Sequence, residues 1–170
     1  YWQAKAELFR WPGLQAAVVN VDDAHGAELA GTVGRRAIDL WTVSCAASTA
    51  TPARLQARSI RYRAQGAMPG LCFLVAEGEE SHELETQLVG QYNVSNLLCV
   101  IGGLRAMGVA LRDAVQACTG LLPVPGRMDC IAEADRPLVA VDYAHTPDAL
   151  DKALSALRPM AQQRGGQLWC

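Results

Sequence analysis

The sequence predicts an α/β fold that is built in two successive parts. Over residues 1–120, short apolar runs typical of buried strands alternate with segments of helical periodicity. A stretch rich in proline and glycine, residues 121–129, interrupts this pattern, and a strand–helix–strand pattern follows. Because that order opens a doubly wound sheet, we expect one domain over residues 1–131 and the start of a second over residues 132–170.

The first part starts with a helical pattern over residues 1–9. Residues 16–21 are apolar and β-branched, as expected of a buried parallel strand, and Asp22 or Asp23 can cap the helix that follows. A second strand is predicted at residues 37–43, before a loop of small residues. This half of the domain should therefore be a parallel strand pair joined by a helix.

Three further strands are predicted at residues 54–64, 70–78 and 82–90. Short turns with glycine or proline separate them, which favours an antiparallel meander. Two consecutive helices are then expected, over residues 93–108 and 110–118.

The second part is predicted to contain a strand at residues 137–144, a helix at 149–164 and another strand at 167–170. Thr146 is the candidate N-cap of this helix, and Pro147 suits its first turn. Residues 132–170 should therefore form a β-α-β unit.

Composition excludes several classes of protein. The chain has 170 residues, 51% of them hydrophobic, and 15 basic against 17 acidic residues give a net charge of −2. We therefore expect neither a nucleic-acid partner nor a membrane partner, because there is no basic excess and no apolar run near the roughly 18–20 residues that span a bilayer. The six cysteines form no CxxC pair, so buried free thiols in a reducing cytoplasm are expected rather than zinc or disulfides.

Both ends of the sequence lie within predicted elements. A helical pattern begins at Tyr1 without a cap, and the predicted strand at residues 167–170 stops at Cys170. We expect from this that the chain is an internal piece of a longer protein.

Two polar residues follow the strand of the second part. Asp142 closes the apolar run and His145 precedes the helix, so both should lie at the carboxyl edge of the sheet, where α/β proteins bind ligands. The alternative is that Asp142 only caps the turn and that His145 is a surface residue. The pattern alone leaves both interpretations open.

Three other positions could take part in ligand binding or catalysis. Arg127 follows a Pro-Gly turn between the two parts, where a guanidinium suits a phosphate or carboxylate, although a solvated linker arginine is the commoner case. Asn93 and Asn96 are spaced i, i+3 at a helix start and could read a base or ribose, or simply cap the helix. Lys5 lies on an otherwise neutral helix face, which is ordinarily a solvated position. The phosphate-binding motifs GxxxxGK[ST] and GxGxxG do not occur.

Several segments occur in an order that resembles the Mur ligase family. These are YNVSN, LLPVPGRM, VDYAHTPDAL and QLWC, preceded by AKAELF and AAVVNVDDAHGAELA. The resemblance spans the whole chain and is closest to the members that add the third residue of the peptidoglycan peptide. It implies the second half of the family's central ATP-binding domain, followed by the first β-α-β of a Rossmann-like C-terminal domain that binds the amino acid.

The resemblance also implies an activity. Members of this family are cytoplasmic ATP-dependent amide ligases that use Mg²⁺ and serve cell-wall biogenesis, cell shape and cell division. The partners would be UDP-MurNAc-L-Ala-D-Glu, whose D-Glu carboxylate forms an acyl phosphate, and an amino acid. That amino acid is expected to be meso-diaminopimelate, as the more widespread choice over L-lysine. The protein is expected to be a monomer.

The resemblance assigns roles by matching position. Asn93 and Asn96 match a pair of asparagines near the adenine, and Arg127 matches an interdomain arginine that contacts ATP. Asp142 matches an acid that contacts the nucleotide, with His145 beside it.

Lys5 matches the family's carbamylated lysine, whose anionic carbamate would help hold Mg²⁺.

The phosphate-binding loop and the substrate-binding N-terminal domain would precede Tyr1, so we expect the chain alone to lack ligase activity. Two alternatives stay open. Cyanophycin synthetase carries a similar segment, with asparagine where this chain has Thr146. A non-catalytic remnant that only binds is the other.

Overall fold

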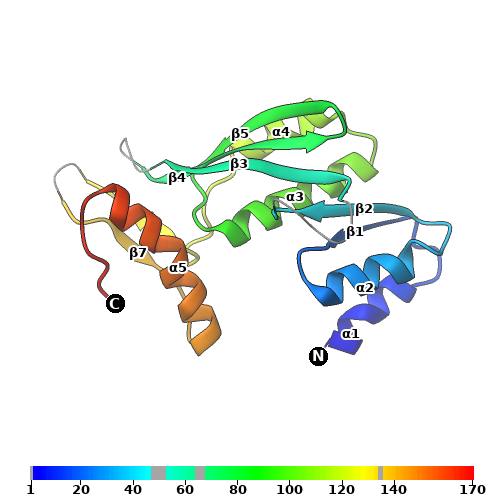
Figure 1. Ribbon diagram of the computed structural model, residues 1–170, viewed down its shortest axis with the longest axis horizontal. Helices are drawn as coiled ribbons and strands as arrows, with labels where there is room; N and C mark the ends of the chain where they lie inside the picture. Colours follow the sequence, from blue (N-terminus) through cyan, green and yellow to red (C-terminus); the bar gives the residue numbers. More distant parts are fainter. Residues whose placement is uncertain (1, 47–52, 64–67, 134–135) are drawn as a thin grey trace.

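The computed structural model describes residues 2–46, 53–63, 68–133 and 136–170 (Figure 1). The larger part is a five-stranded sheet in the order β1-β2-β3-β4-β5, and the smaller part is a two-stranded ribbon, β6–β7, with helix α5. Within these described ranges, none of the helices combines the length and apolar character that a membrane crossing requires. The predicted α/β class is confirmed.

The first elements are a parallel strand pair with a helix between them, as predicted. Their bounds are α1 Trp2–Ala6, η1 Glu7–Arg10, β1 Ala16–Asn20, α2 Ala24–Val33 and β2 Asp39–Ser44. β1 and β2 pair in parallel, and Asp23 caps α2 by accepting from the Gly26 amide at 2.8 Å. The helix predicted over residues 1–9 is divided into one α-helical turn and one 3₁₀ turn.

The predicted meander is present as β3 (Leu55–Arg63), β4 (Gly70–Glu77) and β5 (Glu80–Thr86). Both neighbouring pairs are antiparallel, while β3 joins β2 in parallel. The register of β3 shifts between Arg58 and Arg61, and Ser59 there has a φ of 53°. This irregularity was not predicted, because the alternation of residues 54–64 gives no sign of it.

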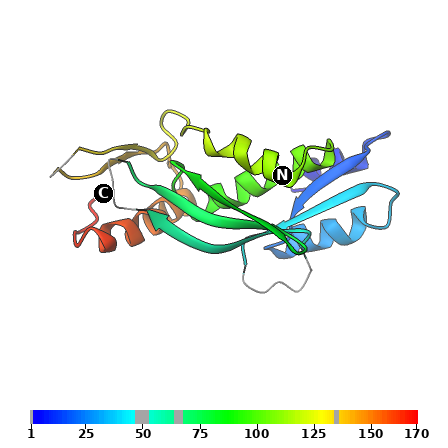
Figure 2. The ribbon, with the colours of Figure 1, turned by 90° about the horizontal axis from the view of Figure 1, so that it is seen from above.

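Helices α3 (Gln91–Ala106) and α4 (Leu111–Thr119) cover one face of the sheet, and α2 covers the other (Figure 2). Successive strand residues point to opposite faces, so Val18 of β1 faces Gly102 of α3 while Val19 packs with α2. The main core lies under α3 and α4 and contains Trp41 and Phe73. The start of α3 is thereby fixed relative to the sheet.

The smaller part contains β6 (Asp129–Ile131), β7 (Val139–Val141) and α5 (Pro147–Gln163). The N-cap prediction for α5 is confirmed, since Thr146 Oγ1 accepts from the Ala149 amide at 3.3 Å.

Two predictions about this part are wrong in detail. Residues 167–170 form no strand, because the described residues offer no third strand beside the β6–β7 pair. No strand was predicted at residues 129–131, where the predicted linker ends at Asp129, yet these residues form β6, which pairs antiparallel with β7. This pairing favours a domain boundary a few residues before 131, and the boundary itself stays a prediction.

Candidate functional site

A cavity of about 610 Å³ lies between α3, the linker, the end of β7 and α5. It brings together four predicted site residues that are far apart in the sequence: Asn93, Asn96, Arg127 and Asp142. Its volume is within the range of about 300–1,000 Å³ that is usual for small-molecule sites. We therefore take this cavity as the candidate site.

The paired asparagines lie in the first turns of α3. Asn93 Nδ2 donates to the Val89 carbonyl at 2.7 Å, and Asn96 Nδ2 donates to Asn93 Oδ1 at 3.3 Å. The N-cap of α3 is Gly90, with a φ of 94° and no side-chain cap, so the capping alternative is wrong. The amide pair is an ordered polar group on the cavity wall.

Apolar side chains form the rest of that wall. Helix α3 and the segment just before it contribute Leu88, Leu97 and Val100. The linker contributes Leu121, Leu122 and Val124. Leu122 is 70% exposed and Val124 is 64% exposed, which is costly unless something covers them. An apolar surface with side-chain amides beside it suits a heterocyclic ring.

Arg127 lies in a tight turn of the linker. Gly126 has a φ of 73°, and the Arg127 amide donates to the Val124 carbonyl at 2.9 Å. The side chain is exposed at the cavity. A guanidinium so placed can bind a phosphate with two parallel hydrogen bonds.

Asp142 follows β7 and is half-buried. Its Oδ2 accepts from the Met128 amide at 2.9 Å and its Oδ1 accepts from the Ala144 amide at 2.8 Å. The turn-capping role that the sequence left open is therefore present in the geometry. Each carboxylate oxygen keeps a second lone pair for a ligand.

Sequence reasoning missed two lining residues, Tyr92 and Lys152. Burial, together with the nearby charge of Asp142, raises the pKa of Tyr92 to about 12, so its phenol stays protonated at neutral pH. Lys152 Nζ is 2.8 Å from Asp148 Oδ2, and this hydrogen bond raises the pKa of the lysine. The helical spacing of Ala149, Lys152 and Ala153 could have revealed this face of α5.

His145 is not a lining residue of the cavity. It is exposed, and its Nδ1 lies 2.8 Å from the Tyr143 carbonyl. Since a carbonyl only accepts, Nδ1 carries the proton, and Nε2 is the acceptor of the neutral ring.

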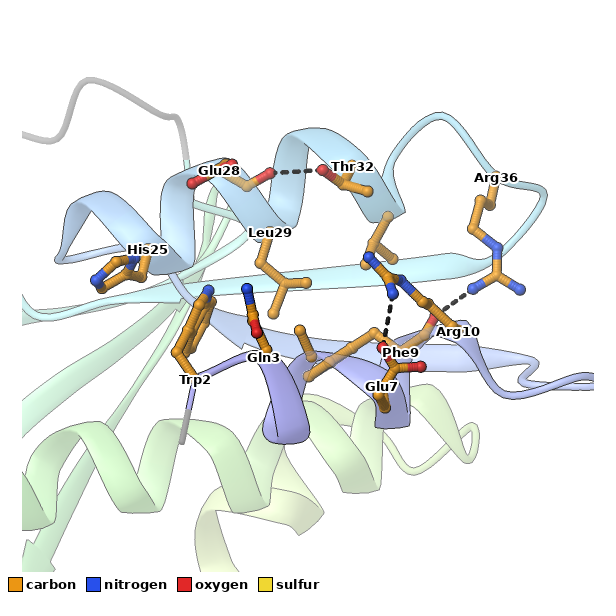
Figure 3. Close-up of a pocket in the computed structure, with 12 residues that line it drawn as sticks. Trp2, Gln3, Glu7, Phe9, Arg10, His25, Glu28, Leu29, Thr32 and Arg36 are labelled. Carbon is orange, nitrogen blue, oxygen red and sulfur yellow. Dashed lines mark hydrogen bonds and ion pairs between the residues drawn. The ribbon is translucent and has the colours of Figure 1, made fainter.

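Lys5 is exposed on α1 and is not a lining residue of the cavity either. Its helix borders a different cavity of about 510 Å³, between α1–η1 and α2 (Figure 3). There the rings of Trp2 and His25 lie 4.9 Å apart, and Arg10 pairs with Glu7 at 2.6 Å. The structure thus does not bring Lys5 beside the other predicted site residues.

Metal-ligating side chains do not gather at the cavity. In the described part of the chain, the one group with ligand atoms close together is Cys72, Glu83 and Glu85, on the sheet. Arg61 Nη2 is 2.9 Å from Glu83 Oε2 and Arg63 Nη1 is 3.1 Å from Glu85 Oε2. A set with a thiol and bound arginines does not suit Mg²⁺, which prefers oxygen ligands.

Comparison with known proteins gives concordant matches. The chain matches the family model described as Mur ligase middle domain over residues 1–104, and the model described as Mur ligase, glutamate ligase domain over residues 126–170. It is 58% identical over its whole length to the UDP-N-acetylmuramoyl-L-alanyl-D-glutamate--2,6-diaminopimelate ligase of Acidovorax sp. (strain JS42), and 46% identical to the protein of that name from Janthinobacterium sp. (strain Marseille). The chain spans about a third of these relatives, 32% and 33% of their lengths.

Solved structures agree. A structure of a ligase with the same name is 32% identical, with a TM-score of 0.74, and the match covers 93% of this chain and 31% of that one. MurF from Acinetobacter baumannii is 22% identical, also with a TM-score of 0.74, over 92% of this chain and 32% of that one, which shows the likeness of fold.

Proposed function

The chain belongs to the Mur ligase family, and from that premise we propose that it is part of an ATP-dependent amide ligase of peptidoglycan synthesis. The enzyme would join meso-diaminopimelate to UDP-MurNAc-L-Ala-D-Glu. The names of the two relatives at 58% and 46% identity support this substrate pair. Since ATP and nucleotide-linked precursors are cytoplasmic, we place the enzyme in the cytoplasm, and we propose that it acts as a monomer without a nucleic-acid or membrane partner.

The observation that carries the proposal is the cavity between α3, the linker, β7 and α5. It gathers two amides, a guanidinium and a carboxylate around an apolar wall. This set suits an adenine nucleotide, because the ring can stack on the leucines while the amides of Asn93 and Asn96 bond its edge. Arg127 would bind the phosphates, and Asp142, which accepts from the Met128 amide next to it, would contact the nucleotide as the resemblance implies.

The reaction has two steps. The D-Glu carboxylate attacks the γ-phosphorus of ATP, which gives an acyl phosphate and ADP. The amine of the amino acid then attacks the acyl carbon, the C–O bond to phosphate breaks, and inorganic phosphate and a proton leave. Arg127 would offset part of the negative charge that gathers on the phosphates.

Mg²⁺ enters the proposal through the family resemblance, since the residues at the cavity form no oxygen cage. The resemblance implies that Lys5, once carbamylated, would supply an oxygen ligand to Mg²⁺. His145 is a candidate for the nucleotide and not for Mg²⁺, and it would contact ATP through Nε2, because its Nδ1 is bonded to the Tyr143 carbonyl.

The test is an exchange of segments. The corresponding third of the Acidovorax ligase is replaced by residues 1–170, and phosphate release is followed with ATP, the UDP-linked dipeptide and either meso-diaminopimelate or L-lysine. We expect activity that requires ATP and meso-diaminopimelate. A soluble, folded chimera without ATP-dependent ligation would refute the proposal.

A matched pair of variants ties the activity to the cavity. Asn96→Ala removes one amide from the wall and should raise the KM for ATP roughly three- to tenfold, the worth of one or two hydrogen bonds. Gln116→Ala removes an exposed amide from α4, outside the cavity, and should leave the KM unchanged.

A further inference from the structure

The turn that carries Arg127 is fastened to the end of β7 at several points. The Met128 amide donates to Asp142 Oδ2 at 2.9 Å, and the Tyr143 amide donates to the Gly126 carbonyl at 3.0 Å. The Tyr143 ring also lies against Gly126, since a Cβ added there would be 2.5 Å from Tyr143 Cε2. These contacts hold both neighbours of Arg127.

The backbone of this turn is strained. Met128 has a φ of 49°, a left-handed conformation that is costly for a residue with a bulky side chain. Such a conformation persists only where the surroundings impose it. The Met128 side chain is 1% exposed, within a cluster that includes Cys130 and Met160, and its amide is bound by Asp142. Burial and the carboxylate together keep Met128 in this state.

Asp142 can therefore influence the direction in which the Arg127 side chain points. Both of its carboxylate oxygens already accept backbone hydrogen bonds, one from the linker and one from its own turn. Loss of the bond to Met128 would let the residue relax toward negative φ, and the Arg127 side chain would swing with it.

We propose that Asp142 is a positioning residue, which, together with the packing of Tyr143 on Gly126, aims Arg127 at the phosphates of the bound nucleotide. The loss of Asp142 then weakens phosphate binding through Arg127, over and above any contact that Asp142 itself makes with the nucleoside. The proposal rests on the proposed function, because it takes the cavity as a nucleotide site.

The first experiment needs no nucleotide. Trypsin cleaves after Arg127 only when the turn opens, so the cleavage rate of the 170-residue chain reports how firmly the turn is held. Asp142→Ala should accelerate cleavage at this bond at least about tenfold, since a hydrogen bond to a charged acceptor is lost. Asp113→Ala, an exposed carboxylate in the first turn of α4, is the matched control and should leave the rate unchanged. An unchanged rate in Asp142→Ala overturns the proposal.

The second experiment compares ADP with adenosine by titration calorimetry. Asp142→Ala and Arg127→Met should each lower the ratio of ADP affinity to adenosine affinity about tenfold, and this ratio cancels any contact that Asp142 makes with the nucleoside. The double variant should lower the ratio no further than Arg127→Met alone, because the two residues act in series. An unchanged ratio in Asp142→Ala, or additive losses in the double variant, would overturn the proposal.

Two further variants guard against a simple loss of folding. Gly126→Ala places a methyl group against the Tyr143 ring. Like Asp142→Ala, it should accelerate trypsin cleavage after Arg127 and weaken ADP binding relative to adenosine binding. Asp142→Asn keeps one acceptor oxygen and should recover part of the ADP affinity. A wild-type chain that binds neither compound would refute the proposed function, while the trypsin comparison would still decide whether Asp142 holds the turn.

Discussion

Two adjacent glycines of α3 give a sharp test of how this helix lies on the sheet. A Cβ at Gly102 would be 2.8 Å from Val18 Cγ1 and 3.6 Å from Leu55 Cδ1, whereas a Cβ at Gly103 would have nothing within 4 Å. Overpacking of this kind costs about 1–3 kcal/mol, because a valine side chain cannot turn freely away. Either substitution gains about 1 kcal/mol of helix propensity. Gly103→Ala should therefore stabilise the chain by about 1 kcal/mol and should be more stable than Gly102→Ala by about 1–3 kcal/mol.

The assay is urea-induced unfolding followed by circular dichroism, with the free energy of unfolding compared between the two variants and the wild type. The helix-propensity gain is common to both variants, so their difference isolates the close approach of α3 to β1. Equal stabilities, or a more stable Gly102→Ala, would refute the packing that fixes Asn93 and Asn96 relative to the sheet.

Three other predictions follow from particular groups. Burial raises the pKa of Cys45 and of Cys130 from 9.0 to about 11, so the unfolded chain loses these protons first. The stability they contribute is present below pH 9 and falls as the pH rises toward 11, by on the order of 1 kcal/mol per thiol after solvent screening. A Cys45→Ala, Cys130→Ala double variant should lack this share of the alkaline loss in unfolding titrations, and an identical pH profile would contradict the assignment. Thr146→Ala should cost about 1 kcal/mol in urea unfolding while Thr146→Ser costs little, and equal losses would argue against the cap. Leu122→Ser should change stability by less than about 0.5 kcal/mol yet weaken ADP binding roughly two- to fivefold in calorimetry, because it removes exposed apolar wall; unchanged affinity would remove Leu122 from the site.

The sequence predicts best those features that depend on neighbouring residues. The caps at Asp23 and Thr146 were predictable, because a cap needs only one polar side chain and an amide three residues on. Residues 167–170 have the composition of a strand, but a strand also needs a partner to accept its hydrogen bonds, and periodicity carries no information about that partner. The strand β6 was missed for the converse reason, since β7 supplies the pairing that its local sequence does not indicate.

The residues of the candidate site also differ in how far the sequence alone could assign them. Pattern alone left Arg127 and Asp142 between a functional and a structural interpretation, and the structure shows them at one cavity with a backbone link between their segments. Helical spacing groups Lys152 with Ala149 and Ala153 on one face of α5, but the sequence does not show that this face and Tyr92 line the same cavity. The role of Lys5 came from resemblance, and its position on α1 leaves that role a proposal.

The most direct test of the proposed nucleotide site is to locate the nucleotide on the chain by NMR. Side-chain amide signals of Asn93 and Asn96 are followed as ADP is added, with the indole N–H of Trp2, at the other cavity, as an internal reference. We expect saturable shifts of both asparagine amides and a stationary Trp2 signal. Saturable shifts of Trp2 with stationary asparagines, or no saturable shift at all, would contradict the claim that the cavity between α3, the linker, β7 and α5 binds the nucleotide.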